Sequence, residues 1–265
     1  MTCRPGTLSC GEHRTPHRWG RTSGSSHRQA RITAAEVRTR TEREIATNTD
    51  PTGPWSLVVP LKPLARAKSR LGRTTGEELR PRLALAFALD TVSAALSCPA
   101  VRDVVVVTDD PVAGPALAAL GARTVADSPA AGLDAALEHG ARSVLSQRPA
   151  AAVAALNADL PALRPGELAR VLDFASAFPR AFVSDAQGIG TTFLSAMPGV
   201  ELRPSFGGPS RARHLASGAG EIAAPGLDSV RRDVDTGDDL RVALALGVGR
   251  FTADLTASAV PVADR

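Results

Sequence analysis

Short apolar runs alternate with amphipathic stretches along most of this chain, from about residue 54 onward. The apolar runs predict buried strands, at 55–61, 104–107, 123–126, 151–156 and 181–184. Between them, apolar residues recur at the spacing of one helix face and predict helices, at 76–96, from 110 onward, at 133–145 and at 165–178. Strands that alternate with helices of this length indicate an α/β fold with a mostly parallel sheet covered by helices on both faces.

The regular pattern loosens after residue 184. Two short strand-like pieces, 190–194 and 200–203, precede a glycine-rich turn and a predicted helix at 210–216. The last predicted helix, 236–246, begins with Thr236 and Asp239, whose spacing is that of a capping box. The sequence has no internal repeat and no second boundary, so we expect residues 54–265 to form one domain.

Residues 1–53 differ from the rest of the chain in composition. They hold nine arginines and five acidic residues, a surplus of four positive charges that equals the formal net charge of the whole protein. This stretch lacks a sustained apolar period, which predicts a disordered basic tail or an over-extended start of the reading frame. The body of the protein is therefore close to neutral.

The cysteine and hydropathy patterns argue against a disulfide-linked, zinc-binding, membrane-spanning or secreted protein. Two of the three cysteines lie in the basic tail and Cys98 stands alone in the body, so neither a disulfide framework nor a zinc cluster is indicated. No apolar stretch is long enough for a membrane span, and the tail lacks the apolar segment of a secretory signal. We expect a soluble, cytoplasmic protein that has no membrane partner.

Three aspartates suggest a metal site. Asp233 and Asp235 alternate on a stretch that we interpret as extended, and residues i and i+2 of a strand share a face. Asp159 follows the apolar run 151–156, at the predicted strand's carboxyl end, where open α/β sheets bind ligands. Mg²⁺ is commonly held by one or two carboxylates together with phosphate oxygens. The alternative is that Asp235 and Thr236 only cap the following helix.

A basic loop, residues 62–71, follows the first predicted strand. It carries Lys62, Lys68 and Arg70 at a position where doubly wound sheets usually bind phosphates. Such side chains can neutralise a triphosphate and stabilise charge on the attacked phosphorus, whereas a solvated basic turn is the alternative. Neither a Walker motif nor a G-x-G-x-x-G motif is present, so P-loop and dinucleotide chemistry are not indicated.

Glycines accompany hydroxyl groups in three further loops. Gly132 lies between a predicted strand and a predicted helix, where it would let the backbone approach a base or ribose. The stretches 188–192 and 207–210 combine glycines with Ser or Thr, and the second opens a helix whose free N–H groups suit an anion. His214 shares a helix face with Ser210, but no Ser/His/acid set accompanies it, so we assign no catalytic histidine.

The sequence resembles the CofC/FbiD guanylyltransferase family in six short segments that occur in the same order and at suitable spacing. They are VPLKPLARAKSRL at 59–71, DSPAAGLDAAL at 127–137, LNADLPAL at 156–163, GIGTTFL at 188–194, FGGPSRARHL at 206–215 and RRDVDTGDDL at 231–240. The resemblance covers the body and none of the tail. It implies a single-domain nucleotidyltransferase fold related to the glycosyltransferase-A type. The implied reaction joins GMP from GTP to a small phosphorylated three-carbon acid in coenzyme F-420 biosynthesis.

The resemblance also implies roles for individual residues. The metal, expected to be Mg²⁺, would be bound by Asp159, Asp233 and Asp235. The phosphoacid would be held by Thr192, Gly207 and Ser210. GTP would be held by Lys62, Lys68, Ser69, Arg70 and Gly132, of which Lys62, Lys68 and Arg70 would also be catalytic. One position departs from the family pattern, because Asp134 stands where Asn is expected, and it leaves the base or ribose contact open.

Three acceptors are compatible with the resemblance. They are phosphoenolpyruvate in high-GC bacterial relatives, 2-phospho-L-lactate in archaeal members and 3-phosphoglycerate in some others. The Arg- and Ala-rich composition indicates a high-GC genome, so we expect phosphoenolpyruvate and the product enolpyruvyl-diphospho-guanosine. The next enzyme of the pathway is a candidate partner.

Two other functions compete with this interpretation. A glycosyltransferase of similar fold would be expected to carry a D-x-D pair after the central strand, where Asp159-Leu160-Pro161 offers one acid. A non-catalytic nucleic-acid binder would need basic and aromatic residues within the folded body. That body is near neutral, and aromatic residues make up 3% of the chain, so we expect no nucleic-acid partner.

Overall fold

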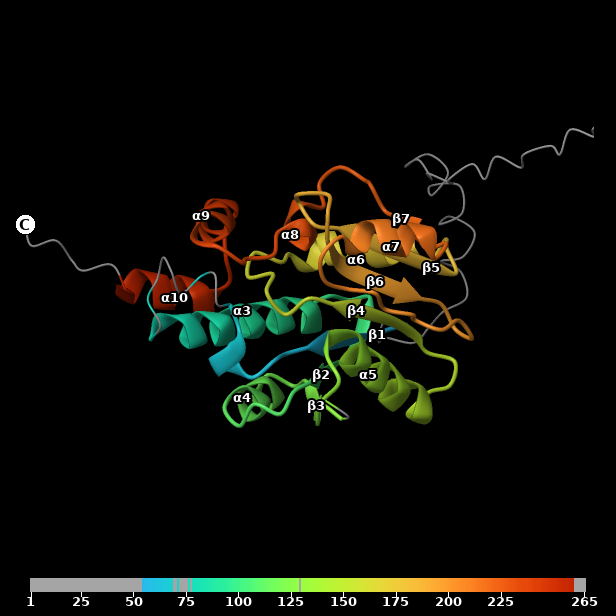
Figure 1. Ribbon diagram of the computed structural model, residues 1–265, viewed down its shortest axis with the longest axis horizontal. Coiled ribbons are helices and arrows are strands. Elements are labelled where there is room, and N and C mark those ends of the chain that lie inside the picture. Colours follow the sequence, from blue (N-terminus) through green and yellow to red (C-terminus); the bar gives the residue numbers. More distant parts are fainter. Residues whose placement is uncertain (1–53, 69–70, 72–75, 77, 129, 260–265) are drawn as a thin grey trace, which may run out of the picture.

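The computed structural model describes residues 54–259 apart from 69–70, 72–75, 77 and 129 (Figure 1). The basic tail predicted at 1–53 lies outside the described residues, as do Ser69 and Arg70 of the basic loop. Within the described part of the chain no helix is both long enough and apolar enough to cross a membrane.

The strands of the described chain form one mixed sheet in the order β3-β2-β1-β4-β6-β5-β7. They are β1 (Trp55–Pro60), β2 (Val101–Val107), β3 (Arg123–Val125), β4 (Ala152–Leu156), β5 (Arg180–Ser184), β6 (Thr191–Ala196) and β7 (Gly220–Glu221). The first four run parallel, β6 is antiparallel to both of its neighbours, and β7 is parallel to β5. The predicted α/β class with a mostly parallel sheet is therefore confirmed.

Helices cover both faces of this sheet, and the central strands are buried on both sides. Leu57 and Val59 of β1 face one core with α3 (Leu79–Leu96) and α6 (Pro165–Ala175), whereas Val58 faces a second core with α5 (Leu133–Gln147). Gly140 lets α5 lie close to the sheet, because a Cβ atom there would come within 2.8 Å of Val107 Cγ2 and closer still to Val58. Uninterrupted apolar runs are what two-sided burial requires.

Helices α9 (Gly237–Leu246) and α10 (Arg250–Ala259) pack beside α3 at one end of the molecule (Figure 1). Phe87 of α3 and Val234, in the segment before α9, are fully buried in the small core between them. Asp90 of α3 accepts hydrogen bonds from the backbone N–H groups of Phe251 and Thr252, at 3.0 and 2.8 Å, and so caps α10. The burial of Val234 against α3 anchors the segment that carries Asp233 and Asp235.

The predicted elements are largely present, with shifted ends. The helix predicted at 76–96 begins at Leu79, and the helix predicted at 165–178 ends at Ala175. The strand predicted at 200–203 is wrong, since residues 201–206 belong to no strand and the carbonyl of Leu202 accepts from Arg180 Nε instead. The other described helices are η1 (Leu64–Arg66), α4 (Ala113–Ala119), α7 (Ser210–Ala216) and α8 (Asp228–Arg231).

The strand directions bring several loops to one edge of the sheet. β1 and β4 are parallel neighbours, so their carboxyl ends lie at the same edge. The antiparallel β6 begins at that edge, where Phe193 pairs with Leu156, the last residue of β4. Residues that follow β1 and β4 and residues that precede β6 therefore meet.

Candidate active site

A cavity of about 650 Å³ lies at this edge of the sheet. Its walls come from the loop after β1, the residues after β4, the loops 185–191 and 206–210, and the segment 233–239. Its cationic lining residues in the described chain are Lys62, Arg66 and Lys68. Its acidic ones are Asp159, Asp185, Asp233, Asp235 and Asp239. The volume suits a small-molecule ligand, and the lining is highly charged.

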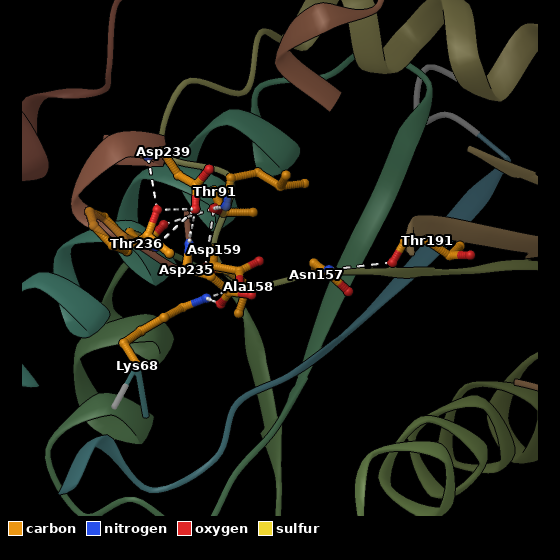
Figure 2. Close-up of polar contacts among 11 residues, drawn as sticks. Lys68, Thr91, Asn157, Ala158, Asp159, Thr191, Asp235, Thr236 and Asp239 are labelled. Carbon is orange, nitrogen blue, oxygen red and sulfur yellow. Dashed lines mark hydrogen bonds and ion pairs between the residues drawn. The ribbon is translucent and has the colours of Figure 1, made fainter. Parts of the chain in front are cut away.

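The backbone around Asp159 is held from two directions, and Figure 2 shows Thr91 next to it. Thr91 is fully buried on α3, and its hydroxyl accepts from Leu160 N at 3.0 Å and lies 3.3 Å from the carbonyl of Ala158. Val234 N donates to the carbonyl of Asp159 at 3.0 Å. The turn that carries Asp159 is therefore tied both to α3 and to the segment containing the other two aspartates.

Asp233 and Asp235 lie in a segment that belongs to no strand of the sheet. They flank Val234, whose side chain is fully buried beside α3. The predicted capping box is confirmed: Thr236 and Asp239 exchange hydrogen bonds at the first turn of α9. The carboxylate of Asp235 forms an ion pair with Lys68.

Lys68 bridges two of the three aspartates. Its ammonium donates to Asp235 Oδ1 at 2.7 Å and to Asp159 Oδ2, and Figure 2 shows the side chain extending toward both. The Lys68 backbone has a φ of +55°, a left-handed conformation that is uncommon for a residue other than glycine. Burial alone would lower the pKa of Lys68, but Asp159 and Asp235 raise it well above its ordinary value. The lysine is therefore a charged part of the cavity lining.

Asp233 has an unusual electrostatic environment. Burial, followed by repulsion from Asp159 and Asp235, raises its pKa to about 8, although Lys68 opposes this shift. A buried carboxyl group that is repelled by neighbouring carboxylates is stabilised in its ionised form when a further cation approaches. The cavity therefore favours the entry of positive charge next to Asp233.

The donor set fits a hard divalent cation. Oδ1 of Asp159 is buried and accepts no hydrogen bond within the described part of the chain. Among the residues that the structure describes, no three acidic, histidine or cysteine side chains lie close enough to enclose a metal ion. Lys68 lies between Asp159 and Asp235. These two carboxylates would have to come closer together to bind the same metal ion. Oxygen donors alone are the preference of Mg²⁺.

The two threonines at the start of β6 have different surroundings. Thr192, which the family resemblance assigns to the phosphoacid, is fully buried, and its hydroxyl lacks a hydrogen-bond partner in the described chain. Thr191 lines the cavity, and its Oγ1 lies 2.9 Å from Nδ1 of His214. The adjacent Asn157 also lines the cavity and bonds the Thr191 carbonyl weakly, at 3.5 Å. Sequence reasoning did not single out Thr191, Asn157 or Asp185.

The glycine-rich loop, residues 205–208, is anchored by two charged side chains. Arg213 of α7 donates to the carbonyl groups of Ser205 and Phe206, each at 3.0 Å, and to that of Gly207. Asp134, in the first turn of α5, accepts from Phe206 N at 2.8 Å. The residue that departs from the family pattern thus has a partner in the protein itself. Ser210 follows this loop, and both it and Gly207 line the cavity.

His214 is a structural link rather than a base. Its side chain is fully buried, and Nε2 accepts a hydrogen bond from Ser205 N at 3.1 Å, which requires Nε2 to be unprotonated. Nδ1 then carries the proton and donates it to the Thr191 hydroxyl. Burial, and then the charges of Arg180 and Arg213, lower the pKa of His214 to about 4.

The remaining predicted site residues differ in how closely they approach the cavity. Lys62 lines it, as expected for the loop after β1. Gly132 immediately precedes α5 with a φ of +108°, a conformation that glycine adopts readily, and the next residue, Leu133, lines the cavity. Ser69 and Arg70 lie outside the described residues.

Known proteins resemble this chain closely in sequence. A phosphoenolpyruvate guanylyltransferase from Streptomyces avermitilis is 70% identical over 199 residues, which cover 75% of this chain and 92% of that protein. One of the same name from Streptomyces coelicolor is 67% identical over 203 residues, covering 77% and 96%. A solved nucleotidyl transferase from Methanothermobacter is 22% identical with a TM-score of 0.53, covering 72% of this chain and 97% of that one, and so shares the fold.

The family comparison agrees with the cavity and with the sequence motifs. The family described as "Guanylyl transferase CofC like" matches residues 55–256, which include every loop that lines the cavity. The match spans most of the chain, and the relatives are covered almost completely. This protein is a member of the CofC-like guanylyl transferase family, a family of nucleotidyltransferases.

Proposed function

We propose that this protein is a phosphoenolpyruvate guanylyltransferase, which transfers GMP from GTP to phosphoenolpyruvate and releases diphosphate. The observation that carries the proposal is the meeting of three aspartates, a basic loop and a glycine-rich loop at one cavity in a guanylyl transferase family member. The name shared by relatives 70% and 67% identical supports phosphoenolpyruvate as the acceptor. The family resemblance supports a place in coenzyme F-420 biosynthesis. The activity belongs to residues 54–265, in the cytoplasm.

The chemical step is an in-line displacement at the α-phosphorus of GTP. An oxygen of the phosphoenolpyruvate phosphate forms a new bond to that phosphorus, and the bond to the bridging oxygen of the β-phosphate breaks. Diphosphate leaves with the electron pair of that bond, and the product is enolpyruvyl-diphospho-guanosine. Both reactants are polyanions, so the main barrier to their approach is electrostatic repulsion.

The cationic groups of the chain act on this repulsion. We assign Lys62, Lys68, Ser69 and Arg70 to the GTP phosphates, with Lys62, Lys68 and Arg70 stabilising charge at the α-phosphate. Gly132 is assigned to the nucleoside, because the next residue, Leu133, lines the cavity. Thr192, Gly207 and Ser210 are assigned to the acceptor, and the cavity-lining Thr191 joins them.

Asp159, Asp233 and Asp235 are assigned to Mg²⁺. The buried, unpartnered Oδ1 of Asp159 and the raised pKa of Asp233 support this assignment. When bound, Mg²⁺ would supply charge neutralisation for the reacting phosphates and the diphosphate leaving group. Thr91 and Val234 hold the backbone of Asp159 in place for this role.

No general base is needed. A phosphomonoester is largely ionised at neutral pH, since its second pKa is about 6. His214, whose imidazole lies nearest the glycine-rich loop, uses both ring nitrogens in hydrogen bonds within the protein. The chain therefore orients its substrates and stabilises charge, and it removes no proton from them.

Diphosphate release by the full-length protein tests the proposal. GTP and Mg²⁺ are supplied with phosphoenolpyruvate, 2-phospho-L-lactate or 3-phosphoglycerate in parallel. We expect release with phosphoenolpyruvate and a loss of at least about 100-fold in Asp233→Asn. Asp238→Asn is the matched control, because Asp238 is exposed on α9 and does not line the cavity. Silence with all three acceptors, in folded protein, would refute guanylyl transfer to these acids.

A further inference from the structure

Lys68 occupies the position between two carboxylates that the proposed function assigns to Mg²⁺. Its ammonium contacts Asp159 Oδ2 and Asp235 Oδ1, and its side chain is only 11% exposed. Asp159 is partly shielded as well, with 21% of its side chain exposed. Asp235 is more open, with 52% of its side chain exposed, so the pair with Asp159 is the shielded one and the pair with Asp235 is nearer to a surface pair.

The local backbone indicates that these ion pairs hold Lys68 in place. A left-handed conformation is unfavourable in a residue other than glycine, and Lys68 adopts it with a φ of +55°. Such a conformation persists only where surrounding contacts offset its cost. The two carboxylates are contacts that can do so, and their charges keep the ammonium protonated.

The same geometry keeps the acids from acting together as ligands. No three acidic side chains of the described residues converge closely enough to enclose a cation, although Asp159, Asp233 and Asp235 are near enough to interact electrostatically. Meanwhile Asp159 Oδ1 is buried without a partner. An ammonium and a divalent cation in this position would repel each other, so both cannot occupy it.

We propose that Lys68 is an internal counter-ion of the metal-free protein, which holds Asp159 and Asp235 until a divalent cation displaces it. The inference rests on the proposed function through the assignment of the metal ligands. Displacement leaves the ammonium at the wall of the same cavity, among the cationic groups assigned to GTP. The metal ion thus replaces the Lys68 ammonium between the carboxylates, and the ammonium becomes available to the phosphates of GTP.

Competition of this kind has a measurable signature. Removing the ammonium removes the competitor, so Lys68→Met should bind a divalent cation more tightly than the wild type. A unit positive charge a few ångströms from the incoming cation repels it strongly, so its removal should tighten Mn²⁺ binding at least about tenfold. Removal of a residue that merely helped to build the site would weaken binding of the divalent cation instead.

Titration calorimetry with Mn²⁺, in the absence of nucleotide, measures this affinity. The proteins compared are the wild type, Lys68→Met and the matched control Lys62→Met. Lys62 lines the same cavity and forms no ion pair among the described residues. Its removal therefore reports the effect of one fewer positive charge without a change in direct competition. Lys68→Asn is a second variant for the case in which Lys68→Met does not fold. Asparagine adopts the left-handed backbone conformation more readily than methionine.

Thermal unfolding gives a second readout. Without metal, Lys68→Met should melt at a lower temperature than the wild type, because Asp159 and Asp235 lose the ammonium that pairs with both of them. Saturating Mn²⁺ should raise the melting temperature more in Lys68→Met than in the wild type, since no ion pair has to be broken.

Each outcome separates the inference from the proposed function. Mn²⁺ affinity that is unchanged or weaker in both Lys68 variants, or that rises no more than in Lys62→Met, overturns the exchange. If the wild type also transfers guanylyl groups in the diphosphate assay, only the exchange fails. Tighter Mn²⁺ binding by the Lys68 variants, in a wild type that is inactive with every acceptor, would support the exchange and refute the proposed reaction.

Discussion

Acidification should destabilise this protein through one buried histidine, His214. In the folded state its Nε2 accepts a hydrogen bond from Ser205 N, and a proton on Nε2 would abolish that bond. The ring also packs against Phe206, with centroids 5.3 Å apart, and two arginines lie near enough to repel a positive charge. The folded protein therefore stabilises the neutral imidazole.

The size of the effect follows from the two pKa values. Burial, together with Arg180 and Arg213, lowers the pKa of His214 from an ordinary value of 6.5 to about 4 in the folded protein. Above pH 6.5 the histidine is neutral in both states and contributes no pH dependence. Between pH 6.5 and 4 the unfolded chain binds a proton that the folded protein does not, so stability falls as the pH falls. The full loss approaches about 3 kcal/mol.

Urea unfolding of the wild type and His214→Gln between pH 7.5 and 4.5 isolates this contribution. At pH 7.5 we expect the variant to be less stable by about 1–3 kcal/mol, because buried hydrogen-bonding groups lose their partner. The difference should shrink steadily as the pH is lowered, since only the wild type carries the histidine. A difference in unfolding free energy that stays constant over this range would refute the argument.

Two further substitutions test other contacts. Thr91→Val should lower the unfolding free energy by about 1–3 kcal/mol and reduce guanylyl transfer, because the buried Leu160 N–H loses its acceptor, whereas Thr91→Ser should retain both properties. Equal stability and activity in the two variants would contradict a positioning role. Gly140→Ala should lower the melting temperature through a cost of about 1–3 kcal/mol, because the added methyl meets Val58 and Val107. The control Gly166→Ala should leave the melting temperature unchanged, because the space around its Cβ position is open. Similar melting temperatures for the two variants would show that α5 can move away from the sheet.

Local patterns were sufficient to predict the layered α/β architecture. Strands such as 104–107 and 151–156 consist of apolar residues without polar alternation, which is the signature of burial on both faces. The capping box of Thr236 and Asp239 likewise depends on neighbours three residues apart. Helix ends were predicted less well, because the last turns of a helix are decided by packing and by local competition for hydrogen bonds.

The strand piece predicted at 200–203 shows where local pattern misleads. Its apolar residues suggested a strand, but Arg180 donates hydrogen bonds to the carbonyl groups of Leu202 and Arg203. A charged side chain from β5 therefore satisfies backbone groups that a neighbouring strand would otherwise have paired with. The pattern of apolar residues at 200–203 cannot predict this contact, because Arg180 lies 22 residues from Leu202 in the sequence.

The sequence by itself determined the order of most strands and helices, the family, and several of the charged residues that border the cavity, because these depend on residue types at short spacing. Only the tertiary structure decided how those groups are partnered. Thr91 and Leu160 are 69 residues apart and Asp134 and Phe206 are 72 apart, so their hydrogen bonds exist only after α3 and α5 have packed on the sheet. The bridge from Lys68 to Asp159 and Asp235 likewise joins three separate loops. Hydrophobic periodicity records which face of an element is buried, but the partner of a polar group is chosen by the packing that brings distant segments together.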